Sequence, residues 1–491
     1  MAFFKYQQLI DDVIAQIDSE QLTNKLPSVR ALARHRNIST ATVVQAYHEL
    51  ERRGWILAKP KQGFFVNTLP RTKLPDYGVA VSHCKAKIPL VEAVQFSFND
   101  SAIVPLSCTA PSTVVDNEAL LNRLYKQAFK TRPFQLIMDD PIEGLPSLRK
   151  QLASHLSHAQ GRVSAAELLI TNGRKDSLQI ALLASNALQS PIAVESPTSF
   201  YFQAMLSQYQ AEVIEVPMQT NYQDELALLS KTHQQRPFKT YLVNPNFADP
   251  TGRLLCVEDK RALLVWSVKH QVTLIEYDRG ELYFGANRPV SLTHLVSHSQ
   301  QHINSPDAEV LSKARVISIG DFYDTVSPTF SLGYLHCKNT YQACLFTKQT
   351  TAEEANVGLQ QMMVQLMSSG QYMQLVEKLR QTMRQQMHSF KQLLSAELNT
   401  LAMPIYISQP SGGPCLWCKL PSELSSAALW DKLIQRNVAI APGSMFTFSS
   451  DYDSFFRVTF ALPWNRVFSE GVTTLGKTIS EFVQQPTRDN G

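Results

Sequence analysis

The chain has 491 residues, of which 44% are hydrophobic and 18% are charged, and its formal net charge is +4. This composition excludes a disordered chain, a collagen-like repeat and a highly charged tail, and the length suits one large two-lobed unit with a smaller attachment. The basic excess is uneven, because residues 1–73 carry eleven Lys or Arg and only six Asp or Glu. Since Lys and Arg neutralise phosphates, the amino-terminal part favours nucleic-acid binding; a solvated basic surface is the alternative.

The first segments of the chain predict three helices and a hairpin. Apolar residues recur at three- and four-residue intervals over 6–17, which indicates an amphipathic helix. A second helix is expected over 27–35, and a third over 41–53 after a break whose hydroxyl groups supply caps. Residues 55–66 predict two short strands around a cationic turn. This order is typical of a winged helix-turn-helix, which puts its third helix into the major groove of DNA and its wing near the backbone or the minor groove.

Several polar residues of this module are in positions that suit DNA contact. Arginines of the second helix can reach phosphates, residues at the start of the third helix can reach base edges, and two lysines tip the wing. A three-helix domain with incidental charge is the alternative interpretation. The candidates from this pattern are Arg30, Arg34, Arg36, Thr40, Thr42, Gln45, Lys59 and Lys61.

Three segments of the module carry a more specific signal: residues 26–33 read LPSVRALA, residues 42–54 read TVVQAYHELERRG, and residues 63–66 read GFFV. Together they resemble the DNA-binding domain of the GntR family of bacterial transcription regulators, over residues 3–68. The positions that this resemblance implies as DNA contacts are Arg30, Thr42 and Gly63.

A linker and a large domain follow. Residues 69–89 contain three prolines, scattered charge and no sustained period, which is typical of a semi-extended linker. We therefore expect a DNA-binding domain over 1–69, a linker over 70–94 and a large domain over 95–486.

From residue 95 onwards, helical patterns alternate with short apolar runs. The runs are 168–171, 192–195, 213–216, 240–243, 272–275 and 316–319. Such alternation predicts an α/β fold with a mostly parallel sheet covered by helices on both faces. Ligands of such folds sit in the loops after the carboxyl ends of the strands.

This succession, together with segments at 410–421, 438–443 and 456–460, is similar to the fold-type I aminotransferases over residues 97–485, including their small carboxyl-terminal α/β lobe. A GntR-type winged helix-turn-helix joined to an aminotransferase-like domain is the arrangement of the MocR subfamily of transcription regulators. The resemblance implies a large domain that senses pyridoxal phosphate or amino-acid-like ligands and that forms a homodimer.

The cofactor chemistry of that family can be compared with the residues of this chain. Pyridoxal-phosphate catalysis needs a lysine amine for the imine, a carboxylate for the pyridine nitrogen and donors for the phosphate. The resemblance over residues 320–334 puts the Schiff-base lysine on Asp324, two loop serines on Asp321 and Tyr323, and the phosphate-binding arginine on Ser331. A carboxylate cannot form the imine, and two acidic groups repel a phosphate unless one of them is protonated. We therefore expect no covalently bound pyridoxal phosphate.

Other positions of the family's pocket differ as well. The resemblance puts Asp249 in place of an asparagine that bonds the cofactor's ring oxygen, and only Asp278 or Glu276 is left to approach the pyridine nitrogen. Ser199 stands at the position of the ring-stacking aromatic, next to Phe200.

Basic residues of this region have two interpretations each. Arg174 and Lys175, at an expected helix start, either supply compensating positive charge or form a solvated helix end. Arg457 matches the arginine that clamps the substrate carboxylate in the family, and the alternative is an internal ion pair with Asp324 or Asp278.

Targeting, membrane and metal sites are not expected. The first twenty residues carry three aspartates within their apolar pattern, and no apolar run approaches the ~18 residues that a membrane span needs. Seven scattered cysteines suit reduced thiols in a cytoplasm. Cys415 and Cys418 are close, but they lack a second pair, and their offset on a strand points the two thiols to opposite faces.

We therefore expect a transcription regulator that binds operator DNA as a homodimer in the cytoplasm, at the nucleoid, and whose large domain has no catalytic residues. Control comes from a carboxylate-bearing small ligand in the degenerate pocket, or from dimer geometry alone. Two alternatives stay open. One is a functional pyridoxal-phosphate aminotransferase with a DNA-binding appendage, and the other is a scaffold that binds a protein partner through the dimer surface.

Overall fold

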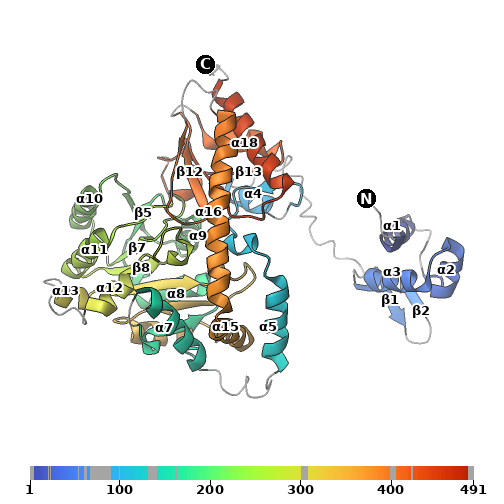
Figure 1. Cartoon of the computed structure of the whole chain (residues 1–491), viewed down its shortest axis with the longest axis horizontal. Coiled ribbons are helices and arrows are strands. Elements are labelled where there is room, and N and C mark those ends of the chain that lie inside the picture. Colours follow the sequence, from blue (N-terminus) through green and yellow to red (C-terminus); the bar gives the residue numbers. More distant parts are fainter. Residues whose placement is uncertain are drawn as a thin grey trace. The chain divides into compact units, whose positions relative to one another are not determined.

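The computed structural model describes residues 5–19, 22, 24–52, 55–59, 63–66, 90–98, 100–130, 141–160, 163–299, 308–398, 405–421, 424–449 and 451–484. The chain divides into two units, residues 1–80 and residues 81–491 (Figure 1). Each unit has its own buried apolar core.

Capping residues set the bounds of the helices in the amino-terminal unit. The helices are α1 (Lys5–Asp18), α2 (Val29–Arg36) and α3 (Thr40–Arg52). The Ser28 hydroxyl accepts a hydrogen bond from the Ala31 amide at 3.3 Å and caps α2, which ends at Asn37 in the left-handed conformation. Ser39 Oγ accepts from the Thr42 amide at 3.1 Å at the start of α3. The prediction of three helices is confirmed.

A short hairpin completes the unit. It consists of β1 (Ile56–Lys59) and β2 (Gly63–Val66), paired antiparallel. The segment before α2 joins it, because the Leu26 amide donates to the Phe64 carbonyl at 2.9 Å and the Val66 amide donates to the Asn24 carbonyl at 2.7 Å. The hairpin is thereby attached to the helices as the predicted wing. The core beneath it contains Leu9, Ile10, Val13, Leu26, Leu32, Ala33, Val43, Ala46, Tyr47, Leu50 and Ile56.

The large unit is built on a seven-stranded sheet. In spatial order the strands are β4 (Leu168–Thr171), β10 (Gly333–His336), β9 (Val316–Asp321), β8 (Thr273–Tyr277), β7 (Thr240–Val243), β5 (Ile192–Ser196) and β6 (Val213–Pro217). β10 is antiparallel to both of its neighbours, and the other neighbouring pairs are parallel. All six predicted runs are strands, so the mostly parallel sheet is confirmed. β10 is not among those runs, because four residues at the end of a long loop give no periodic signal.

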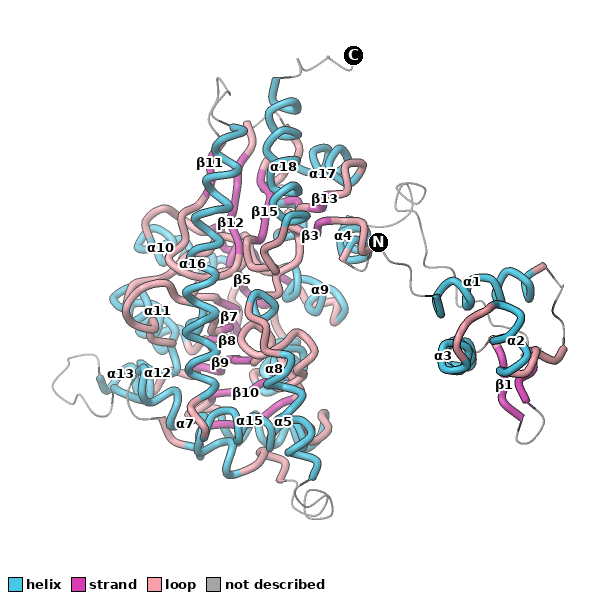
Figure 2. Tube along the Cα trace, turned by 45° about the vertical axis from the view of Figure 1, so that its right-hand side comes forward, coloured by secondary structure: helices cyan, strands magenta, loops and turns pink. Residues whose placement is uncertain are grey.

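Helices cover both faces of this sheet (Figure 2). One face packs against α8 (Arg174–Ala184), α9 (Phe200–Gln208) and α14 (Tyr341–Thr351). The other packs against α10 (Tyr222–Gln235), α11 (Val257–His270), α12 (Leu292–Ser299) and α13 (Ala308–Ser312). Consecutive residues such as Leu274 and Ile275 belong to different cores, because side chains alternate across a strand.

A further apolar core lies against β4. It is formed with α5 (Glu118–Lys130), α7 (Pro146–Gln160) and α15 (Val357–Ser368). The 28-residue α16 (Gln371–Leu398) then runs along the unit to the carboxyl-terminal lobe (Figure 1). The 3₁₀ helices are η2 (Pro111–Val114), η3 (Ala165–Glu167), η4 (Ala187–Gln189), η5 (Gly280–Leu282) and η6 (Gly443–Phe446).

The carboxyl-terminal lobe combines segments from both ends of the unit. Its four-stranded sheet has the order β11 (Tyr406–Ile407), β12 (Cys415–Lys419), β15 (Phe455–Thr459) and β14 (Ala441–Pro442), with all pairs antiparallel. The helices that pack with it are α17 (Ser426–Ile434), α18 (Arg466–Gln484) and α4 (Leu90–Ser97). β3 (Val104–Pro105) pairs in parallel with β13 (Val438–Ala439). The predicted small lobe is confirmed.

Candidate functional site

The second helix of the amino-terminal unit presents arginines to the solvent. Arg30 and Arg34 are exposed one turn apart on α2. Arg36 is exposed too, and its guanidinium lies 2.9 Å from the Asp12 carboxylate. An exposed pair of this kind contributes at most about 1 kcal/mol, so a DNA phosphate can take the place of Asp12.

The third helix presents polar side chains in its first two turns. Thr40 and Gln45 are exposed, as direct contact with base edges requires. Thr42 is half-buried, and its Oγ1 lies 2.8 Å from Ser39 Oγ. Thr42 therefore takes part in the cap of α3, in addition to any contact with DNA.

Lys25, which is not among the predicted DNA contacts, lies beside β2 of the wing. Gly63 is exposed at the start of β2 with φ +103°, which side chains rarely adopt. Lys25 Cε lies 3.7 Å from the place that a Cβ at this glycine would take, and its ammonium lies 5.7 Å from the Phe65 ring. Only the pairing of its segment with β2 brings Lys25 there, so no local pattern reveals it. The Lys59 side chain and all of Lys61 lie outside the described residues.

In the large unit, the carboxyl ends of β8 and β9 bring acidic and aromatic side chains together. The Tyr277 hydroxyl donates to Asp321 Oδ2 at 2.7 Å, and the Tyr323 amide donates to Asp321 Oδ1 at 2.9 Å. Burial, followed by the charge of Asp324, raises the pKa of Asp321. Arg174, the first residue of α8, stacks 4.0 Å over the Tyr323 ring, and its positive charge partly offsets these effects.

Asp324 is held by a neighbouring arginine. Its Oδ2 accepts hydrogen bonds from Arg279 Nη2 at 2.8 Å and Arg279 Nε at 3.1 Å, and both side chains are buried. Its other oxygen, Oδ1, has no hydrogen-bond partner within the described part of the chain. Arg279 follows β8 and Asp324 follows β9, so two adjacent parallel strands supply the pair. Asp324 is therefore not the ion-pair partner of Arg457.

A second buried ion pair joins the two lobes of the large unit. Arg457, on β15, is 1% exposed and donates to Asp249 Oδ1 at 2.7 Å and to the Ser107 carbonyl at 2.6 Å. Burial disfavours the Asp249 carboxylate, but the charges of Arg457 and Arg279 outweigh burial and lower the pKa of Asp249. Asp249, which the resemblance puts in place of an asparagine, is thus the ion-pair partner of Arg457.

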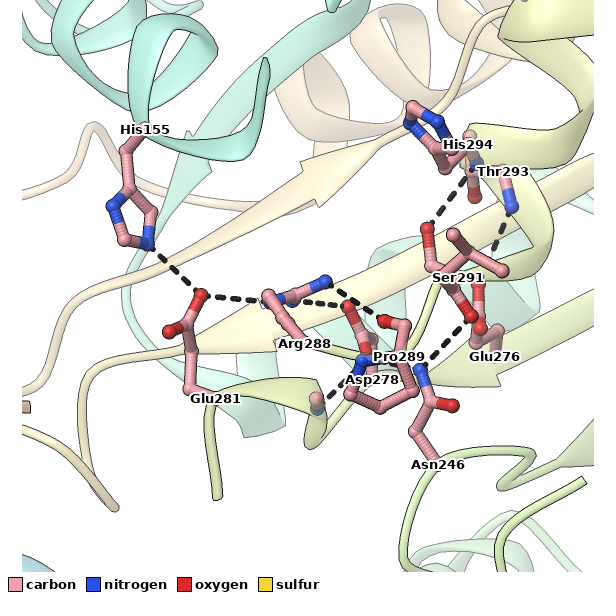
Figure 3. Close-up of polar contacts among 12 residues, drawn as sticks. His155, Asn246, Glu276, Asp278, Glu281, Arg288, Pro289, Ser291, Thr293 and His294 are labelled. Carbon is pink, nitrogen blue, oxygen red and sulfur yellow. Dashed lines mark hydrogen bonds and ion pairs between the residues drawn. The ribbon is translucent and has the colours of Figure 1, made fainter. Parts of the chain in front are cut away.

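Glu276 and Asp278 have different surroundings (Figure 3). Both oxygens of Glu276 accept from the Leu292 amide, at 2.9 and 3.1 Å, and burial followed by the charge of Asp278 raises the Glu276 pKa to about 7. Asp278 accepts from Arg288 Nη2 at 2.6 Å and is therefore not the partner of Arg457 either. Glu276 does not line the pocket, because Tyr277 follows it on the strand and alternate side chains point to opposite faces.

Arg288 links Asp278 to Glu281, which in turn contacts His155 of α7 (Figure 3). Arg288 Nε donates to Glu281 Oε1 at 2.9 Å, and the same oxygen lies 2.9 Å from His155 Nε2. Burial disfavours the Glu281 carboxylate, but His155 and Arg288 outweigh burial and lower its pKa to about 2. Arg288 could not be predicted as part of this site, because only the fold places it beside Asp278 and Glu281.

A small cavity lies between these groups. Its volume is about 20 Å³, which is room for about one water molecule. The predicted pocket residues that line it are Asp278, Asp321 and Asp324. Those that do not are Asp249, Tyr323, Ser331 and Arg457. The wall also contains the aromatic side chains of Tyr277, Phe322, Tyr334 and Tyr372.

The aromatic residue beside Ser199 covers the second ion pair. Ser199 precedes α9, and the Phe200 ring lies 5.5 Å from the Arg457 guanidinium and 6.0 Å from the Phe446 ring. Phe446 lies 4.9 Å from the same guanidinium. The two rings exclude water from Arg457 and thereby strengthen its attraction to Asp249.

Other kinds of site have few candidates. Within the described ranges no group of three or more His, Cys, Asp or Glu side chains is arranged to hold a metal ion. Cys415 and Cys418 are buried on β12 as free thiols. None of the helices that the structure describes combines the length and the apolar character needed to cross a membrane.

Comparison with protein families gives two matches. Residues 5–66 match the family described as bacterial regulatory proteins, gntR family. Residues 137–276 and 349–467 match aminotransferase class I and II, which together is more than half of the chain. The first match contains α2, α3 and the wing, and the second contains most of the sheet and Arg457.

Individual proteins are similar over nearly the whole chain. YjiR of Escherichia coli, named as an uncharacterised HTH-type transcriptional regulator, is 26% identical over 93% of this chain and 94% of its own. YdcR of the same organism, named likewise, is 25% identical over 97% of this chain and 99% of its own. The crystal structure of LysN, an α-aminoadipate aminotransferase from Thermus thermophilus, superposes with a TM-score of 0.68 at 20% identity over 81% of this chain and 96% of that one. This last likeness shows the fold of the large unit.

Proposed function

Because the chain belongs to the aminotransferase class I and II family and begins with a gntR-family region, we propose that it is a MocR-type transcription regulator that binds operator DNA. The observation that carries the proposal is the presence of a winged helix and an aminotransferase fold in one chain, with relatives named as regulators aligned across both parts. The protein acts in the cytoplasm as a homodimer, as such regulators bind paired half-sites.

The large unit, in this proposal, has no transaminase activity. Pyridoxal phosphate, the cofactor of the aminotransferase fold, does not fit the residues around Asp324. No lysine lines the cavity there, and the carboxylates of Asp321 and Asp324 repel a phosphate. The cavity volume of about 20 Å³ is far below the roughly 300–1,000 Å³ of small-molecule sites.

A carboxylate-bearing ligand is the effector class that the second ion pair favours. An arginine fork binds carboxylates in two-point geometry, and in this chain the Arg457 fork is divided between the Asp249 carboxylate, which accepts from Nη1, and the Ser107 carbonyl, which accepts from Nη2. A ligand carboxylate therefore competes with Asp249 for Arg457. Because the pair joins the two lobes, exchanging its acid for a ligand biases the lobe arrangement, which is the differential affinity that control requires.

The test of the regulator proposal is binding of the full chain to duplex DNA from its own upstream region. We expect preference over a scrambled duplex of equal length, with affinity that falls steeply as salt rises. Equal binding to both duplexes would overturn it. In parallel, a visible absorption band that forms with pyridoxal phosphate, and that borohydride abolishes while it leaves a phosphopyridoxyl group covalently attached to the protein, would instead support a functional aminotransferase.

A further inference from the structure

The outward face of α3 carries a compact apolar patch in its first two turns. Ala41, Val44 and Gln45 lie three and four residues apart and are exposed, and Thr40 lies beside them. Val44 is 40% exposed. Two small apolar side chains and one carboxamide therefore share the part of the helix that enters a major groove.

Packing within the unit does not account for this patch. The residues of α3 that face the core are Val43, Ala46, Tyr47 and Leu50, each without exposed surface. Val44 and Gln45 follow Val43 directly and point away from that core. The Gln45 carboxamide makes no side-chain hydrogen bond to the other residues that the structure describes in this unit, and is therefore open to an outside partner.

The chemistry of these side chains selects among base pairs. Guanine is read mainly by Arg or Lys, whereas Gln forms a bidentate pair with adenine N6 and N7, and small apolar groups contact the thymine methyl. None of the four residues of the patch is basic. Positive charge that can meet phosphates is carried by the exposed Arg30 and Arg34 of α2, the helix that precedes α3 and packs against it.

We propose that α3 recognises A·T base pairs, with Ala41 and Val44 against thymine methyl groups and Gln45 on an adenine. The proposal rests on the function proposed above and adds the base composition of the half-site. The exposed arginines of α2, the helix that packs against α3, favour DNA as the occupant of the patch over an apolar protein surface.

The experiment uses the full chain and an operator selected from a random duplex pool. Thymines of the selected half-site are replaced one by one by uracil, which removes only the C5 methyl. We expect about fourfold weaker binding at each contacted position, the equivalent of one buried carbon. In the Val44→Ala variant the uracil and thymine duplexes bind more nearly alike, since interacting groups give non-additive changes. Val467→Ala, at a valine that is 61% exposed in the large unit, is the matched control and leaves the uracil effect unchanged.

The adenine contact has a separate readout. Gln45→Ala is expected to lose about 5- to 150-fold of the preference for adenine over the other bases at one position, whereas Gln223→Ala, at an exposed glutamine of α10, loses none. Tight, sequence-specific binding to half-sites with G·C pairs at these positions, or no uracil effect, overturns the inference and leaves the regulator function standing. Absence of any sequence-specific DNA binding overturns the regulator function itself.

Discussion

Arg279 donates two hydrogen bonds to Asp324, both to the same carboxylate oxygen, Oδ2, and the buried Oδ1 has no partner within the described part of the chain. The pair is buried and comes from the ends of two adjacent strands. A buried pair of this kind adds little net stability, but loss of one partner leaves the other charge uncompensated. Asp324, onto which the resemblance puts the family's lysine, is therefore tied to its neighbour Arg279 by charge.

Asp324→Lys tests whether the fold tolerates a lysine opposite Arg279. Two cations then face each other in the core, so the free energy of unfolding is expected to fall by about 3–5 kcal/mol in denaturant titrations. The variant is also expected to develop no visible absorption band with pyridoxal phosphate. Glu309→Lys is the control, because its pair with Lys313 is exposed and solvent screens the interaction, so we expect little change in the free energy of unfolding. A stable Asp324→Lys protein that forms a visible band with pyridoxal phosphate, and that keeps a covalent phosphopyridoxyl adduct after borohydride reduction, would contradict this expectation.

Asp249→Asn tests whether Arg457 accepts an outside carboxylate. The variant is less stable than the parent chain, since the Arg457 charge loses its counter-ion. Succinate is expected to raise the Tm of the variant more than that of the parent chain. The neutral analogue succinamide is expected to raise both Tm values equally little. Asp451→Asn, at an exposed acid of the lobe that carries Arg457, should respond to succinate as the parent chain does. An equal response of both variants to succinate argues against Arg457 as the ligand site.

Glu276 gives a pH-dependent stability with a definite sign. Its pKa is raised from 4.5 to about 7, so the folded protein holds a proton that the unfolded chain has released between these values. Stability is therefore highest below pH 4.5 as far as this group is concerned, and falls by up to about 3 kcal/mol as pH rises to about 7.

The comparison that isolates this effect is Glu276→Gln against the parent chain, unfolded in denaturant at pH 5 and pH 8. The variant should lose less stability between the two pH values, because Gln carries no titrating proton. Glu309→Gln, at an exposed acid, should keep the parent's dependence. Parallel curves for Glu276→Gln and the parent chain would refute the assignment.

Arg30→Ala tests the phosphate contacts of α2. Affinity should fall by a similar factor for specific and scrambled duplexes, and the slope of log affinity against log salt should become shallower by about one unit. Arg466→Ala is the matched control, because this arginine is exposed in the large unit. A change in base preference with an unaltered salt slope would move Arg30 from the phosphates to the bases.

Much of the architecture follows from local patterns. The three helices, the wing and six of the seven strands can be predicted from apolar periodicity and caps, because each element buries a face that its own residues define. The family resemblance of both parts is accessible in the same way, through contiguous segments, whereas the match of Asp324 to the family's lysine stays a prediction.

The partners of the buried charges could not be predicted. Asp249 and Arg457 are far apart in sequence, and only the packing of the carboxyl-terminal lobe on the sheet brings them within 2.7 Å. Likewise, nothing in the sequence distinguishes Glu276 from Asp278, yet the fold gives them different partners, because the Leu292 amide reaches Glu276 and the Arg288 guanidinium reaches Asp278. Lys25 reaches the wing through a strand pairing that leaves no local trace.

The pairing of β3 with β13 has a consequence for synthesis of the chain. Val104 leaves the ribosome early, whereas its partner Val438 follows roughly 300 residues later, which takes roughly 15–60 s at ordinary elongation rates. The winged helix can form in that interval from its own contacts. A truncated product that ends before residue 405 therefore contains the whole core of the winged helix but lacks β11, β12, β14 and β15, the four strands of the carboxyl-terminal sheet.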